Sequence, residues 1–94
     1  MTDEPGIYVE GKFGVRIENI LLCVLDEENE FGRFLKFEPL TLCPYDLRPV
    51  IVEMLTMEER KWLNDYNRHV RETLLPHLSD EADRKWLTNA TREL

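Results

Sequence analysis

The hydrophobic and polar residues of this chain follow two different patterns, and the change between them falls near Leu55. Before Leu55, β-branched and aromatic residues form short runs interrupted by glycine, which predicts β-strands at residues 7–9, 15–25 and 34–42. Turn residues at positions 26–32 predict a polar loop between the last two strands. After Leu55, helix-forming and charged residues predict two helices. The order of elements predicts an α+β fold, with a small antiparallel sheet of about three strands followed by two helices.

The second predicted strand carries a nearly continuous apolar run. Its members are Ile17, Ile20, Leu21, Leu22, Val24 and Leu25. A strand with one face in water alternates apolar and polar residues, whereas a strand covered on both faces does not. We therefore expect this strand to be covered on both faces for much of its length, which requires more covering structure than this chain obviously has.

The first predicted helix has clear start and stop signals. Thr56 and Glu59 form a capping-box pattern, in which each side chain can satisfy a backbone N–H group at the helix start. Pro76 ends or kinks the helix because it lacks an N–H group. Apolar residues recur at helical spacing along one face: Leu63, Tyr66, Val70 and Leu74. The residues expected in the core at the beginning of this helix are Met57, Trp62 and Leu63.

The last predicted helix is shorter. Either Ser79 or Asp80 can cap its first turn, because both side chains accept hydrogen bonds from backbone N–H groups. Three residues at four-residue intervals are expected to form its buried stripe, which Leu94 could extend: Ala82, Trp86 and Ala90.

Length and charge exclude several classes of protein. With 94 residues, of which 43% are hydrophobic, the chain can form one small domain with one modest core. A formal charge of -7 argues against nucleic acid and anionic membranes as partners, because both present negative phosphates. No apolar stretch approaches the roughly 20 residues of a membrane helix, and residues 1–6 do not form a signal peptide. Cys23 and Cys43 lack metal-site spacing, so we expect two buried free thiols and a cytoplasmic location.

Two glutamates are the candidates for chemistry. Glu18 stands among aliphatic residues in the middle of the predicted strand 15–25, where a buried carboxylate would need a cation or strong donors beside it. Arg16 lies on the same face two residues away, so an ion pair is possible but not well aligned. If residues 10–12 form a three-residue hairpin loop, paired residue numbers sum to 22 and Glu4 lies opposite Glu18.

Opposed carboxylates can be explained in two ways. They repel each other in a sheet, whereas a pair of divalent metal ions turns this repulsion into a binding site. Alternatively, Glu4 is an exposed residue near a flexible terminus, and Glu18 faces water on an edge strand. The spacing of the two residues taken alone favours this second explanation.

Longer motifs favour the metal site. Residues 3–8 (DEPGIY) and 11–19 (GKFGVRIEN) resemble the closing signature of the Xaa-Pro aminopeptidases, which are pita-bread metallopeptidases. Residues 37–44 (FEPLTLCP) resemble the strand F-E-x-L-T-L-x-P of that family, and residues 62–66 (WLNDY) resemble its helix W-L-N-x-Y. The resemblance covers essentially the whole chain.

The resemblance implies roles for four residues. Glu4 would be a metal ligand that also takes up a proton as general base, and Glu18 would be a ligand that bridges two metal ions. Arg16 and Tyr8 would support the site. The cofactors implied are two divalent ions, commonly Mn²⁺ in this family. The other ligands of the family, two Asp and one His, come from upstream, so this chain alone should bind metal weakly.

The implied activity is hydrolysis of the N-terminal X-Pro bond of peptides with proline in the second position. Residues 1–54 would be the last part of the catalytic domain, and residues 55–94 a helical extension. Met1 would then lie inside the catalytic domain, so we expect a C-terminal fragment of a longer enzyme that is inactive alone. His69 and His77 are expected to be surface or packing residues rather than replacements for the missing ligands.

Two other functions remain open. The chain could be a non-catalytic module for dimerisation or another interaction, with three aromatic residues as anchors if they are exposed: Trp62, Tyr66 and Trp86. A piece of a larger sheet should also expose strand edges and apolar faces, so a homo-oligomer is expected. The last possibility is a free-standing acidic α+β domain without a metal role.

Overall fold

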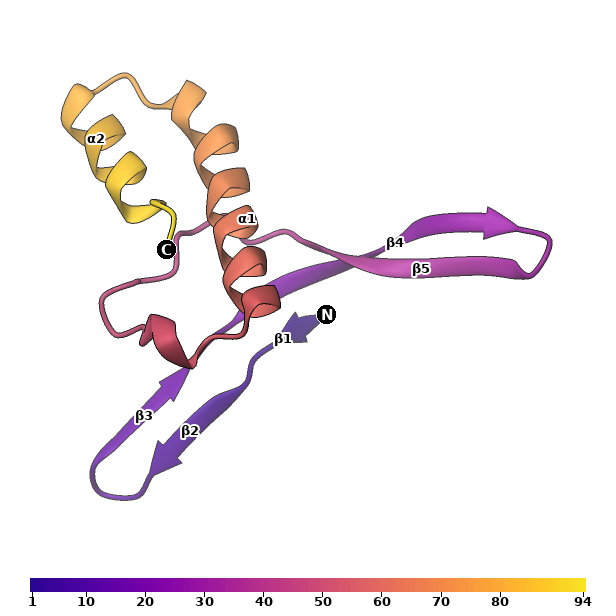
Figure 1. Ribbon diagram of the computed structural model, residues 1–94, viewed down its shortest axis with the longest axis horizontal. Coiled ribbons are helices and arrows are strands. Elements are labelled where there is room, and N and C mark those ends of the chain that lie inside the picture. The colour runs from indigo at the N-terminus through magenta and orange to yellow at the C-terminus, as the bar shows by residue number, and fades with distance from the viewer. The chain divides into compact units, whose positions relative to one another are not determined.

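The structure is a computed structural model that describes residues 1–94 as two compact units (Figure 1). Residues 1–41 form a β unit that contains all five strands, and residues 42–94 form a helical unit that contains both α-helices. The predicted α+β class, with antiparallel strands followed by two helices, is confirmed. The assignment of residues 1–54 and 55–94 to a catalytic domain and its extension stays a prediction.

The strands of the β unit all pair antiparallel. They are β1 (Thr2–Asp3), β2 (Gly6–Val9), β3 (Phe13–Arg16), β4 (Asn19–Asn29) and β5 (Gly32–Pro39). A three-stranded sheet has the order β1-β4-β5, and β2 pairs with β3 in a two-stranded hairpin.

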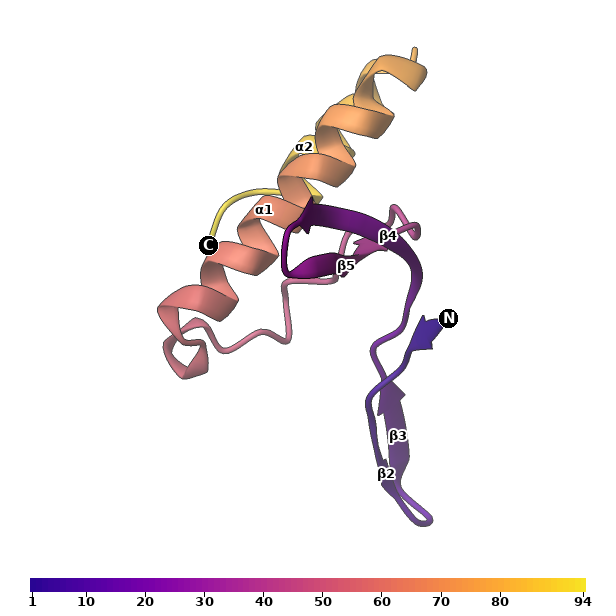
Figure 2. The same cartoon turned by 90° about the vertical axis from the view of Figure 1, so that its right-hand side faces the viewer.

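The predicted strand 15–25 is wrong as a single element. β3 ends at Arg16 and β4 begins at Asn19, and the chain bends between them (Figure 2). The N–H group of Ile17 donates to the carbonyl oxygen of Pro5 at 3.0 Å. Pro5 has no N–H group to donate in return, so the ladder of hydrogen bonds is incomplete at this point.

The predicted loop 26–32 is also wrong. β4 continues to Asn29 and β5 resumes at Gly32, so only Glu30 and Phe31 connect them. The Asn29 side chain accepts a hydrogen bond from the Phe31 N–H group at 2.8 Å. Gly32 adopts a φ of 136°, a conformation that residues with a Cβ atom rarely adopt. The polar residues read as a loop are the solvent-facing end of a long hairpin.

The β unit has no apolar core. No apolar residue between positions 1 and 41 is buried, and the aliphatic residues of β4 expected to be covered are partly or largely exposed. The hairpin of β4 and β5 has only β1 beside it in this unit, so neither of its faces is covered. The expected covering of this strand on both faces is therefore not provided by this unit, and the need for additional covering structure stays a prediction.

Both cysteines are exposed, contrary to the prediction of buried thiols. Cys23 lies opposite Phe37 in the uncovered hairpin, and Cys43 lies in the segment that follows β5. For Cys23, an apolar sequence context predicted burial, but burial also requires a second layer of structure that the β unit lacks.

The helical unit begins with an irregular segment and a 3-10 turn. Its elements are η1 (Val52–Met54), α1 (Met57–Leu74), η2 (Leu75–His77) and α2 (Glu81–Ala90). The predicted capping box is confirmed: Thr56 accepts from the Glu59 N–H group at 3.1 Å, and Glu59 accepts from the Thr56 N–H group at 2.8 Å. α1 ends before Pro76 as predicted, and Asp80 caps α2 through the N–H groups of Ala82 and Asp83.

The core of this unit lies between α1 and α2, which run antiparallel side by side (Figure 1). Its buried members are Tyr66, Val70 and Leu87. The predicted apolar face of α1 is thus confirmed, whereas the prediction for α2 is wrong. Trp86 is 64% exposed and Leu87 only 2% exposed, so the buried face is rotated by one residue, about 100°, from the predicted stripe.

Two further core predictions for α1 are wrong. Met57 is 90% exposed, and Trp62 is 54% exposed although its ring stacks on Tyr66 with centroids 5.6 Å apart. Leu63, in contrast, is buried as predicted. None of the helices is long and apolar enough to cross a membrane.

Candidate metal-ligand site

The register predicted for the first hairpin is confirmed. Val9 pairs with Phe13, and Gly6 pairs with Arg16, so the paired numbers sum to 22 around the loop 10–12. Gly11 in this loop has a φ of 70°, a left-handed conformation that glycine adopts without strain. The same sum holds where β1 pairs with β4, as in Asp3 and Asn19.

This register places Glu4 opposite Glu18, between the two regions of regular pairing. Met1 and Leu21 exchange two backbone hydrogen bonds, and Ile17 donates to Pro5. Because such pairs alternate along an antiparallel ladder, Glu4 and Glu18 fall on a non-hydrogen-bonded position, where opposite Cα atoms approach to about 4.5 Å. Their side chains also share one face of the ladder, since side chains alternate between faces.

Arg16 lies between the two carboxylates. Its Nη1 is 3.3 Å from Glu4 Oε1, and its Nη2 is 3.6 Å from Glu18 Oε2. The Thr2 hydroxyl donates to the other carboxylate oxygen of Glu4. An ion pair of Arg16 with Glu18 was predicted as possible but not well aligned, whereas the guanidinium group reaches both carboxylates. The side chains of Arg16, Glu4 and Glu18 are each 42–50% exposed, so these ion pairs are accessible to water and contribute little stability.

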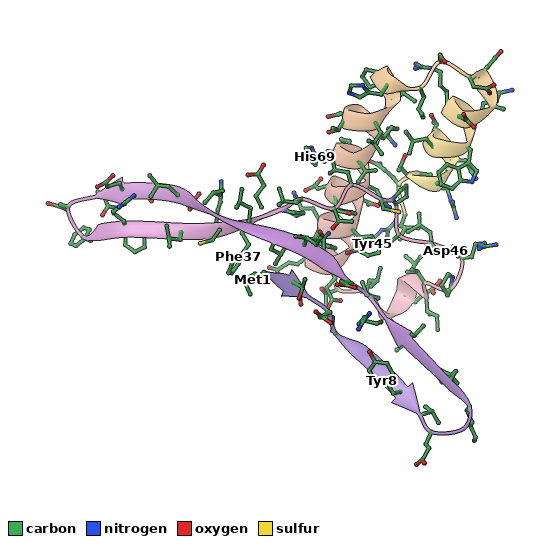
Figure 3. All side chains as sticks on the ribbon, turned by 180° about the vertical axis from the view of Figure 1, so that it is seen from behind. Met1, Tyr8, Phe37, Tyr45, Asp46 and His69 are labelled. Carbon is green, nitrogen blue, oxygen red and sulfur yellow. The ribbon has the colours of Figure 1, made fainter.

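Tyr8 lies on the hairpin of β2 and β3 (Figure 3), and the register places it on the same face as Arg16. Its ring lies against Gly14 on the opposite strand and Gly6 on its own strand, because a Cβ atom at either glycine would come within 2.8 Å of Tyr8 atoms. The two glycines therefore leave the space in which the ring lies flat on the backbone. All four residues predicted for the site, namely Glu4, Tyr8, Arg16 and Glu18, belong to one face of one ladder.

The donor set fits part of a site for hard divalent cations. Two carboxylates that share a face suit oxygen-preferring ions such as Mn²⁺ or Mg²⁺. Nowhere in the chain do three or more His, Cys, Asp or Glu side chains gather in a way that could hold a metal ion. His69 and His77 belong to the helical unit and contribute to no such group. The residues present therefore fit such ions as part of a larger ligand set.

Two residues beside the site, Asn19 and Thr41, were not predicted from the sequence. Asn19 accepts a hydrogen bond from the Thr41 N–H group, and Thr41 accepts one from the Ile20 N–H group. Asn19 was visible in the R-I-E-N motif and Thr41 in the strand motif F-E-x-L-T-L-x-P. Their proximity could not be read from either motif, because it depends on how β4 and β5 pair.

Comparison with known families assigns the class of the chain. A family model described as the C-terminal region of peptidase M24 matches residues 33–94. The chain therefore belongs to this family of peptidase C-terminal regions.

Individual relatives narrow the class to the Xaa-Pro aminopeptidases. Aminopeptidase P1 of Lotus japonicus is 43% identical over 94 residues, which cover 97% of this chain and 14% of the relative. Xaa-Pro aminopeptidase 1 of Dictyostelium discoideum is 37% identical over 99 residues, covering 100% of this chain and 16% of the relative. The predicted resemblance is confirmed, and the chain spans about one seventh of the length of these relatives.

A solved structure has the same fold as this chain. The X-prolyl aminopeptidase of Caenorhabditis elegans, described as a cytosolic enzyme with a di-nuclear active site, matches with a TM-score of 0.85 and 36% identity. The match covers 99% of this chain and 16% of the nematode enzyme. The fold of this chain is that of a C-terminal part of an X-prolyl aminopeptidase.

Proposed function

We propose that this chain is the C-terminal part of a metal-dependent Xaa-Pro aminopeptidase, to which it contributes two metal ligands. The main support is that Glu4 and Glu18 lie opposite each other and share the Arg16 guanidinium group. The family of the chain and the di-nuclear site named for the nematode enzyme support the same conclusion. The substrates would be peptides with proline in the second position, and the enzyme would be cytoplasmic.

The chemistry assigned to this chain is ligation and proton transfer. Two divalent ions, which we propose to be Mn²⁺, supply Lewis-acid polarisation of the scissile carbonyl group when bound. Glu4 would hold an ion and would take up a proton as general base, and Glu18 would be the second metal ligand from this chain. Arg16 orients the two carboxylates through its two ion pairs, and Tyr8 supports the same face from β2.

The chain by itself should be inactive and should hold no metal tightly. Two carboxylates are fewer ligands than a di-nuclear site requires, and affinity depends on ligand number and preorganisation. We assign residues 1–54 to the end of the catalytic domain and residues 55–94 to its helical extension. The upstream part of the enzyme would supply the other ligands and would cover the exposed apolar side chains of the β unit.

A graft onto the nematode enzyme tests this function. The matching 16% of the C. elegans X-prolyl aminopeptidase is replaced by residues 1–94, and metal content and cleavage of an X-Pro peptide are measured. We expect the graft to contain two metal ions per chain and to cleave the peptide. The 94-residue chain and the truncated nematode enzyme should each do neither. Tight Mn²⁺ binding or cleavage by the chain alone would contradict the proposal, as would a folded, metal-free graft.

An interaction role of the helical unit is a second candidate. Trp86 and Trp62 are both more than half exposed on this unit, and aromatic residues often anchor interfaces, whereas Tyr66 is buried. We expect sedimentation of the 94-residue chain to reveal a concentration-dependent homo-oligomer. A Trp62→Ala, Trp86→Ala variant should shift it towards monomer. A wild-type chain that stays monomeric at high concentration would argue against this role.

A further inference from the structure

Asn19 differs from every other residue of the β unit in its burial. It is the only buried residue between positions 1 and 41, with 7% of its surface exposed, although asparagine is rarely chosen for burial. It is also the first residue of β4, directly after Glu18. A buried amide side chain at this position has a specific hydrogen-bonding role.

Thr41 makes two hydrogen bonds with the start of β4, one with the Asn19 side chain and one with the Ile20 backbone. The Thr41 N–H group donates to Asn19 Oδ1 at 3.3 Å, and the Ile20 N–H group donates to Thr41 Oγ1 at 3.0 Å. The Leu40 N–H group donates to the Ile20 carbonyl oxygen at 2.7 Å, which continues the pairing of β4 with β5 beyond Pro39. The side chains of Asn19 and Thr41 thus extend the ladder where the regular strand has ended.

The Thr41 hydroxyl group takes the place of a backbone acceptor. In a complete antiparallel pair, the Ile20 N–H group would donate to a carbonyl oxygen of the partner strand. β5 ends at Pro39, and the threonine side chain accepts this hydrogen bond instead. The backbone at the start of β4 is therefore held from the β5 side although the strand β5 is no longer regular there.

The same segment is also held from the opposite side. Asp3 pairs with Asn19, and Asp3 directly precedes Glu4. Asn19 is therefore covalently attached to one candidate ligand and hydrogen-bonded through its backbone to the neighbour of the other. If the backbone at Asn19 moved relative to Asp3, the position of Glu18 relative to Glu4 would change as well.

We propose that Asn19 and Thr41 form a positioning clamp, which sets the backbone spacing of Glu4 and Glu18 and thereby the metal affinity of the site. The hydrogen bonds of the clamp join Asn19, Ile20 and Thr41, so we assign its two residues as positioning residues and not as ligands. This inference rests on the proposed function, because the affinity it controls is that of the proposed site.

The clamp is tested with variants from each of its halves. Thr41→Val removes the hydroxyl group that accepts from the Ile20 N–H group but keeps a β-branched side chain, whereas Thr41→Ser keeps the hydroxyl group. Asn19→Leu removes the side-chain oxygen that accepts from the Thr41 N–H group. In the 94-residue chain, we expect hydrogen exchange of the Ile20 amide to become about tenfold faster in Thr41→Val, as loss of one hydrogen bond predicts. In the graft, the Kd for Mn²⁺ should rise about 10- to 100-fold in Thr41→Val and Asn19→Leu, as for other residues that orient ligands. Thr41→Ser should restore both values.

Controls separate positioning from general stability. Thr88→Val removes a hydroxyl group that donates to the Arg84 carbonyl oxygen in α2, and it should change neither readout. If Glu18→Gln loses Mn²⁺ from the graft while Thr41→Val and Asn19→Leu retain it, the clamp is refuted and the proposed function stands. If Glu18→Gln and Glu4→Gln both retain two ions, the proposed function fails and the clamp with it. If a variant graft does not fold, the 94-residue chain still decides. An unchanged rate of hydrogen exchange at the Ile20 amide in its Thr41→Val variant refutes the clamp.

Discussion

Replacing Leu87 by alanine should lower the free energy of unfolding of the helical unit by about 2–5 kcal/mol. Leu87 is 2% exposed and packs with Tyr66 and Val70 in the buried cluster between the two helices. Truncation removes apolar contacts and leaves a cavity that two short helices cannot close completely. A unit of this size has a total stability of about 3–8 kcal/mol, so the variant should be largely unfolded near 37 °C.

Trp86→Ala is the matched control for this prediction. It removes a larger side chain from the neighbouring position of α2, but Trp86 is 64% exposed. Its effect should stay within about 1 kcal/mol, because exposed positions contribute little to stability. Urea unfolding of the 94-residue chain, followed by helix content, measures both variants. A larger loss in Trp86→Ala than in Leu87→Ala would show that the buried face of α2 is the one first expected from the sequence.

Glu4→Gln should reduce kcat of the graft by about 10²- to 10⁴-fold. Glutamine keeps the size of the side chain but can neither carry a negative charge nor take up a proton. Glu18→Gln should primarily remove metal ions, because Glu18 is proposed as a shared ligand without a proton-transfer role. Comparison of metal content with kcat at saturating Mn²⁺ therefore separates the two roles.

The control for these variants is Glu10→Gln, which makes the same change of charge in the loop of the same hairpin. Glu10 lies at the far end of this hairpin from Glu4 and Glu18, so the variant should retain wild-type metal content and kcat. Equal losses in all three variants would mean that net charge, and not these two positions, sustains the activity. Full activity of Glu4→Gln at saturating Mn²⁺ would remove Glu4 from the role of general base.

The sequence by itself determined the features that depend on near neighbours along the chain. The loop around Gly11 set the register of the first hairpin, because a three-residue loop allows only one pairing of the flanking strands. This register places Glu4 opposite Glu18. The ends of α1 also followed from the sequence, because each signal acts on the helical turn nearest to it. Thr56 and Glu59 cap the start of the helix, and Pro76 follows its end.

Only the tertiary structure decided which side chains are covered and which partners meet across strands. The apolar run after Glu18 looked buried, yet most of it is exposed in this unit, because burial depends on layers outside the segment itself. Helical spacing suggested Trp86 for the core, but the position of α1 selected Leu87. The clamp of Asn19 and Thr41 likewise joins residues 22 positions apart, a contact that arises only when β4 and β5 pair.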